Sequence, residues 1–120
     1  MKKTSIGITE KNKQAIADQL AIILADEFVL YSKTLNAHWN VKGPDFHTVH
    51  LYLETLYNEQ QVIVDTVAEK IRTLGHYASG QLNKYLELTH LTEKTSKKND
   101  SQSYFADLLS DHESIVMFLR

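Results

Sequence analysis

Four side chains that can bind metal recur at helical spacing in the middle of the sequence. His50 and Glu54 are four residues apart, and so are Asp65 and Glu69. At about 100° per residue on a helix, all four lie within an arc of roughly 100° and share one face. The chain contains no cysteine, so a metal would be held by His, Asp or Glu. Such a mixture of imidazole and carboxylate ligands suits iron(II), manganese or zinc.

The two pairs are too far apart along the helix for one metal. Eleven residues separate Glu54 from Asp65, which corresponds to about 16 Å at a rise of about 1.5 Å per residue. Two antiparallel copies that cross near residues 59 and 60 would bring the first pair of one chain to the second pair of the other. A two-fold axis makes two such sites. His38, at the end of the preceding helix, can reach the same cluster.

A simpler interpretation exists for each feature taken alone. A His–Glu pair four residues apart on a helix is often a surface ion pair. Trp39, beside His38, is by itself more often an anchor of the core. Together, two imidazoles and three carboxylates favour a site for two metal ions, because each ion brings a high positive charge that ligands must offset.

Long helices must position these residues, because one proline and four glycines are the only strong breakers. The first predicted helix starts at an N-cap Thr9 and ends before Gly43 and Pro44. The second is capped by Asp45 and ends at Gly75. A short helix over 81–88 and a polar, Lys-rich loop over 92–103 follow. The pattern is that of an antiparallel hairpin with a long crossover.

A last helix is predicted from Ser103, with an inner stripe at Phe105, Leu108, Leu109, His112, Ile115, Val116 and Leu119. It reaches Arg120 without a cap or a breaker. Three long amphipathic helices leave an apolar groove where a fourth would lie. We therefore expect a single domain over residues 1–120 that is C-terminally incomplete, unless a partner fills the groove.

Composition limits the function classes. Net charge is −2 and the sequence pI is about 6.3, so no basic field draws the whole chain to nucleic acid or to a membrane. The N-terminal residues lead into no apolar signal core, and no run of about 18 apolar residues suggests a membrane span. An intracellular protein is the natural interpretation.

The sequence resembles the signature of the Dps family over approximately residues 20–91. In that family a first His is followed by a second His 12 residues later, a carboxylate 16 later, an Asp 27 later and a Glu 31 later. Counted from His38, this sequence has His50, Glu54, Asp65 and Glu69 at those four positions. The matching motifs are His38-Trp39-Asn40-Val41-Lys42-Gly43, Phe46, His50, Asp65, Ala68-Glu69-Lys70 and Leu74-Gly75.

The resemblance implies an all-α, ferritin-like four-helix bundle with a short helix in the middle crossover. Twelve subunits would form a hollow shell. Iron(II) would be oxidised, with hydrogen peroxide as the preferred oxidant, at di-iron ferroxidase sites between two-fold-related subunits, and ferric mineral would be stored inside. His38, His50 and Glu54 of one subunit and Asp65 and Glu69 of its mate would be the metal ligands. Trp39 would supply or trap an electron beside the site.

Three features depart from the family pattern. Glu54 stands where Asp is usual, the fourth helix is absent from the sequence, and the N-terminus offers only Lys2 and Lys3 before Lys11 and Lys13. Few phosphate contacts mean that DNA binding is expected to be weak or absent. A cytoplasmic location is implied, with nucleoid association left open. The alternative function is a structural, adhesive or DNA-compacting cage with a vestigial metal site.

The remaining histidines have simpler roles. Glu87 and His90 fit a Glu-x-x-His di-iron motif, but a single copy on a short helix disfavours it. His47 is expected to face solvent unless it is an accessory ligand, and His112 to be a hydrogen-bonded core residue. His76 follows a helix C-terminus, where positive charge is favourable. Lys94, Lys97 and Lys98 are expected in a solvated loop.

Overall fold

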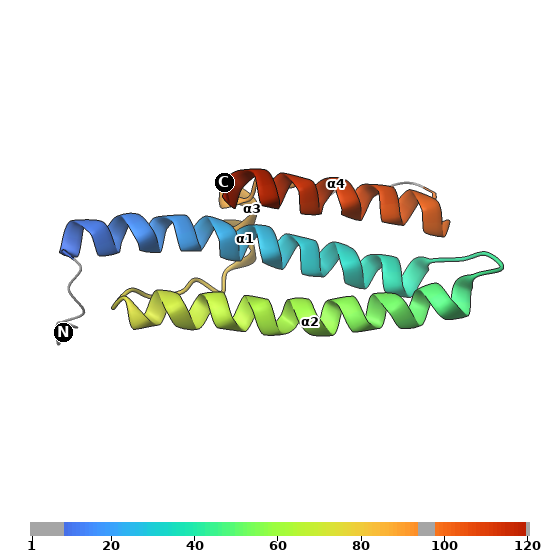
Figure 1. Cartoon of the computed structure of the whole chain (residues 1–120), viewed down its shortest axis with the longest axis horizontal. Helices are drawn as coiled ribbons and strands as arrows, with labels where there is room; N and C mark the ends of the chain where they lie inside the picture. Colours follow the sequence, from blue (N-terminus) through green and yellow to red (C-terminus); the bar gives the residue numbers. More distant parts are fainter. Residues whose placement is uncertain (1–8, 94–97, 120) are drawn as a thin grey trace.

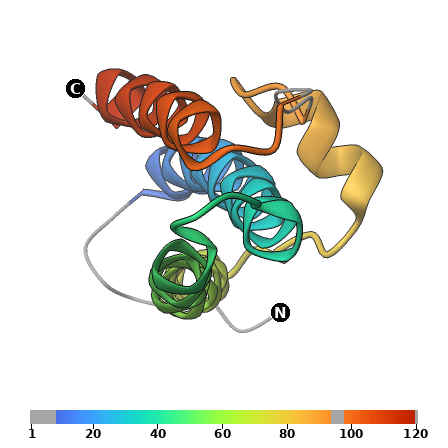
Figure 2. The ribbon, with the colours of Figure 1, turned by 90° about the vertical axis from the view of Figure 1, so that its right-hand side faces the viewer.

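A computed structural model describes residues 9–93 and 98–119 of the chain, and four helices account for most of them. The first two, α1 (Glu10–Asn40) and α2 (Phe46–Thr73), form an antiparallel hairpin (Figure 1). The other two are α3 (Leu82–Leu88) in the crossover and α4 (Ser101–Leu119). Viewed end-on, α1 lies between α2 and α4, with α3 to the side (Figure 2). The described residues contain no β-strand, which confirms the all-α prediction.

The predicted ends of the hairpin helices are confirmed. The Thr9 hydroxyl accepts a hydrogen bond from the backbone N–H of Asn12, at 3.2 Å between the heavy atoms, and so caps α1. At the end of α2, Gly75 has a φ of 86°, which suits a residue without a side chain. Asp45 lies at the N-cap of α2, but its side chain makes no capping bond there. Its carboxylate accepts a hydrogen bond from the Ser101 hydroxyl at 2.6 Å, which fixes the start of α4 beside the α1–α2 turn.

Gln60 is a buried amide in the middle of α2. Gln60 is 4% exposed, and neither its Nε2 nor its Oε1 has a hydrogen-bond partner among the described residues. A buried polar group without a partner keeps its full desolvation cost.

We therefore expect Gln60→Met to raise the free energy of unfolding by about 1–3 kcal/mol, because Met keeps the length of the side chain and loses the amide. Urea unfolding followed by circular dichroism measures this. Gln61→Met is the matched control, since Gln61 is exposed on the same helix and should change stability little. Equal or lower stability of Gln60→Met would contradict the expectation.

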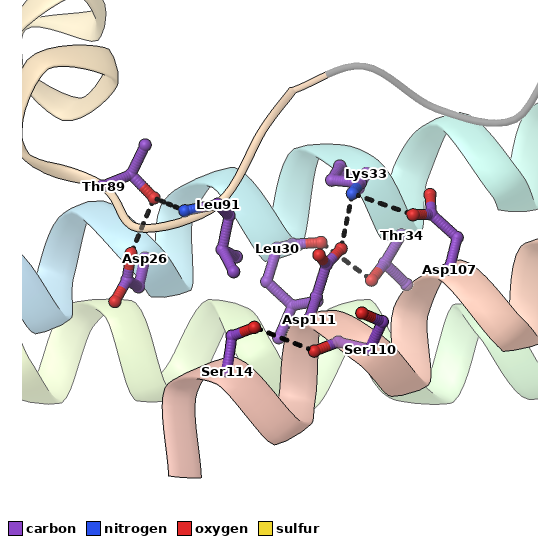
Figure 3. Close-up of polar contacts among 10 residues, drawn as sticks. All are labelled: Asp26, Leu30, Lys33, Thr34, Thr89, Leu91, Asp107, Ser110, Asp111 and Ser114. Atoms are coloured by element: carbon purple, nitrogen blue, oxygen red, sulfur yellow. Dashed lines mark hydrogen bonds and ion pairs between the residues drawn. The ribbon is translucent and has the colours of Figure 1, made fainter. Parts of the chain in front are cut away.

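A buried carboxylate ties the crossover to α1. Asp26 is 0% exposed and accepts hydrogen bonds from the Thr89 hydroxyl and the His90 backbone N–H, both at 2.6 Å. The ring Nδ1 of His90 lies 3.0 Å from its other oxygen. Figure 3 shows Asp26 pointing from α1 toward Thr89. His90 thus serves the crossover, while Glu87 is paired with Lys84 at the surface, which is inconsistent with a metal site at Glu87 and His90.

The face that α4 buries differs from the predicted one. The helix begins at Ser101, and its buried residues are Ser101, Tyr104, Leu108, Asp111 and Ile115. The prediction was right for Leu108 and Ile115 and wrong for the exposed residues Phe105, Leu109, His112, Val116 and Leu119. His112 is therefore no core histidine. The reason is that α4 is apolar on two faces, and only the face that carries Asp111 packs on α1, where Lys33 meets that carboxylate.

The second apolar face of α4 borders a groove beside α2. The groove has a volume of about 400 Å³, and its lining residues are Tyr52, Leu56, Phe105, Leu108, Leu109 and His112. This confirms the predicted apolar groove, while the identity of what fills it stays a prediction.

The other surface predictions have mixed outcomes. His47 is exposed, as expected. The backbone carbonyl of His76 accepts a hydrogen bond from Arg72. Lys98 is exposed, whereas Lys94 and Lys97 lie outside the described residues. Among the helices of residues 9–93 and 98–119, none has both the length and the apolar character that crossing a membrane needs.

Candidate metal centre

Two histidines are locked together where α1 ends beside the first turns of α2. The Nδ1 of His38 lies 2.8 Å from the backbone carbonyl oxygen of His50, and the Nδ1 of His50 lies 2.7 Å from the carbonyl oxygen of His38. The rings stack with their centroids 3.7 Å apart and an angle of 18° between their planes. The carbonyl of His38 is available because it lies in the last turn of α1, where intrahelical donors run out.

This pairing fixes the tautomer of both rings. A carbonyl oxygen only accepts hydrogen bonds, so both Nδ1 atoms must donate. In a neutral imidazole the other nitrogen, Nε2, then carries a free lone pair. Histidines that bind metals are typically oriented by such a bond from the non-ligating nitrogen to a carbonyl or a carboxylate. The orientation of both rings is the one that such histidine ligands have.

The three predicted carboxylate ligands lie along the exposed face of α2. Glu54, one turn after His50, is exposed, and so are Asp65 and Glu69 further along the helix. An exposed helix face is the ordinary place for charged side chains, and carboxylate oxygens are also ligands that hard cations prefer. The structure thus brings His38 and His50 together with Glu54 close by in sequence, while Asp65 and Glu69 lie farther along α2.

Within the described part of the chain, no three His, Asp or Glu side chains form a metal-binding group. The roles of the five residues as shared ligands stay a prediction.

Trp39 is not a core anchor, because 68% of its surface is exposed. It follows His38 directly and lies in the last turn of α1. Phe46, at the start of α2, stacks on His50 with 5.0 Å between ring centroids. The catalytic role of Trp39 stays a prediction.

The sequence analysis did not identify Tyr57 as part of this site. Its hydroxyl donates a hydrogen bond to Oε1 of Glu54 at 3.4 Å, and its ring packs edge-on against His38 with 5.1 Å between centroids. Burial raises the pKa of Tyr57, and the negative charge of Glu54 raises it further, so the phenol keeps its proton and remains a donor. The sequence signal was present, because position 57 is three residues from Glu54 and seven from His50.

Glu27 lies farther along α1, half-buried on the same stripe as His38. Burial raises the pKa of its carboxyl group, and the neighbouring charge of Asp26 raises it further. No described contact joins it to the histidine pair, so we do not include it in the centre.

Comparisons with known proteins identify the family and the fold of the chain. Residues 17–120 match the family described as ferritin-like domain. The chain is 34% identical over 120 residues to an uncharacterized low temperature-induced protein of Nostoc sp., covering 100% of this chain and 67% of that protein. It is 33% identical over 109 residues to DNA protection during starvation protein 2 of Bacillus anthracis, covering 91% of this chain and 73% of that protein.

The fold is similar to a solved Dps structure. The Dps protein from Vibrio cholerae superposes with a TM-score of 0.80 at 29% identity, covering 98% of this chain and 78% of that one. That protein is described as a member of a broad superfamily of ferritin-like diiron-carboxylate proteins. The chain spans about two thirds to three quarters of the length of these relatives. On the family match, the sequence identity and the shared fold, the chain belongs to the ferritin-like family and, within it, to the Dps mini-ferritins.

Proposed function

We propose that this protein oxidises iron(II) with hydrogen peroxide at sites shared by two subunits and stores the ferric product inside a shell. The observation that carries the proposal is the reciprocal hydrogen bonding of His38 and His50, which leaves both Nε2 atoms free to bind metal. The carboxylates of Glu54, Asp65 and Glu69 supply the hard oxygen ligands and the negative charge.

Two subunits complete the site in this proposal. His38, His50 and Glu54 come from one chain, and Asp65 and Glu69 come from its two-fold mate. The larger assembly is a closed homo-oligomer, which we take to be a dodecamer by similarity to the family. The likeness to a diiron-carboxylate protein supports two irons at each site.

The reaction balances without a further reagent. Each of two iron(II) ions loses one electron. Hydrogen peroxide takes up both electrons, and two protons from the solvent, as its O–O bond breaks, and two water molecules form. Consuming iron(II) and hydrogen peroxide together suppresses the formation of hydroxyl radicals, and this reaction is how the protein protects against oxidative damage in our proposal. We propose a cytoplasmic location. With a net charge of −2, weak or absent DNA binding fits the same proposal.

The test is an anaerobic titration with iron(II), followed by a stoichiometric pulse of hydrogen peroxide. Absorbance of the ferric product and mass by size-exclusion chromatography are recorded on the same sample. Rapid ferric absorbance in a large assembly is the expected result. Oxidation no faster than in protein-free buffer, from a well-assembled shell, would contradict the enzymatic function and favour a structural cage.

A further inference from the structure

We propose that Tyr57 is a positioning residue that holds the Glu54 carboxylate beside the histidine pair and thereby sets the metal affinity of the site. The inference rests on the proposed function, because it concerns the ligands of the same centre. It goes beyond that function by assigning a role to a residue that binds no metal itself.

Tyr57 is held from two sides in one orientation. Its ring meets His38 edge-on, with 5.1 Å between centroids and 76° between planes. On the other side it meets Tyr31 in the same manner, at 6.4 Å and 73°. Edge-to-face pairs of aromatic rings are attractive, so these contacts resist rotation of the ring. These contacts therefore fix the position of the phenol oxygen, which lies within hydrogen-bonding distance of the Glu54 carboxylate, one helical turn away.

Glu54 needs such a guide. It is exposed, and among the described residues its carboxylate accepts a side-chain hydrogen bond from Tyr57, at 3.4 Å. A free glutamate side chain loses conformational entropy when it is fixed by a metal. A donor on Oε1 restricts the carboxylate before metal arrives and leaves Oε2 open for binding.

Glu54 needs a partner that orients it because its side chain is long. The Dps family usually has Asp at this position, and Glu is longer by one methylene. A longer ligand samples more orientations, and partners that orient ligands typically change metal affinity by about 10–100-fold. Because the bond here is long, we expect Tyr57 to contribute about tenfold.

The experiment measures binding of cobalt(II) to the assembled protein, with affinity from a titration of its visible absorption and no turnover involved. Tyr57→Phe removes only the hydroxyl and should weaken binding about tenfold. Tyr52→Phe is the matched control, because Tyr52 is an exposed tyrosine of α2 that contacts Phe105 and should leave affinity unchanged. Circular dichroism and size exclusion establish that fold and assembly are equal.

A double-mutant cycle with Glu54→Asp separates positioning from a general structural effect. The shorter carboxylate cannot reach the phenol, so Tyr57→Phe should change affinity less than twofold in that background. Unchanged affinity in Tyr57→Phe, or an equal loss in both backgrounds, would overturn the inference. A wild type that binds no cobalt(II), or binds it equally well after Asp65→Ala, would instead overturn the proposed function and the inference with it.

Discussion

Mixing two inactive variants of this chain is expected to restore about a quarter of the wild-type rate of iron oxidation. One variant, His38→Ala/His50→Ala, lacks the nitrogen ligands. The other variant, Asp65→Ala/Glu69→Ala, lacks the two carboxylates that a subunit contributes to the site of its two-fold mate. In a two-fold dimer of one copy of each, one site carries both defects and the other carries neither. Random pairing makes half of the dimers mixed, so about one site in four is intact.

Each variant alone should oxidise iron(II) at the protein-free rate, because it has no complete site. The measurement is ferric absorbance after a peroxide pulse, before and after the two variants are dissociated together and reassembled. Mass spectrometry of differently tagged chains establishes that mixed assemblies form. The matched control is Glu93→Ala/Glu113→Ala, which removes the same charge from exposed positions away from the proposed helix crossing and should keep the wild-type rate.

Failure of complementation has a definite meaning. If mixed assemblies form and oxidation stays at the protein-free rate, the histidines and the carboxylates do not meet across a two-fold axis. Activity in Asp65→Ala/Glu69→Ala alone would show that this pair is dispensable. In either case the assignment of shared ligands would be wrong, although the fold and the family would stand.

The hairpin could be predicted from the sequence because its signals are local. Thr9, Gly75 and the Gly43-Pro44 break act on their immediate neighbours, and their effects on helix ends do not depend on tertiary structure. The spacing of the candidate ligands was likewise readable, since a helix converts sequence distance into rotation and rise.

The orientation of α4 could not be predicted in the same way. Its apolar residues cover two faces, so periodicity alone does not say which face is buried. A charged residue usually points to solvent, which favours His112 over Asp111 as an inward residue. The structure reverses this because Lys33 of α1, far away in sequence, is buried opposite Asp111.

The details of the metal centre could not be predicted either, because they also depend on contacts between residues far apart in sequence. Spacing suggested that His38 could reach His50, but the exchange of hydrogen bonds depends on carbonyls that only the packed hairpin brings together. The ties of Asp26 to the crossover also join residues more than sixty positions apart. Local patterns name the candidate ligands, whereas tertiary contacts select the tautomer and the neighbours that orient them.

The buried charge pair between α1 and α4 leads to the largest expected effect on stability. Lys33 is 3% exposed, and its Nζ lies 2.5 Å from Oδ2 of Asp111 and 3.3 Å from Oδ1 of Asp107 (Figure 3). Replacing Lys33 by Met leaves the Asp111 carboxylate buried without its cation. We expect the free energy of unfolding to fall by about 3–5 kcal/mol, as measured by urea denaturation.

The double variant Lys33→Met/Asp111→Leu should recover most of this loss, because it removes both charges and places apolar groups between the helices. Lys84→Met is the matched control. Lys84 and Glu87 form an exposed pair at 3.8 Å, so its loss should cost less than about 1 kcal/mol. Equal losses in Lys33→Met and Lys84→Met would contradict a buried pair between α1 and α4.

The loss in Lys33→Met should also depend on pH. Burial already raises the pKa of Asp111, while Lys33 lowers it, so removing the lysine raises this pKa further. An acid with a raised pKa in the folded state is favoured when protonated, and its contribution to stability is lost as pH rises through that pKa. The penalty should therefore be largest at neutral pH and shrink in acid. A penalty that is constant with pH would mean that lost packing of the lysine stem, rather than the uncompensated carboxylate, causes it.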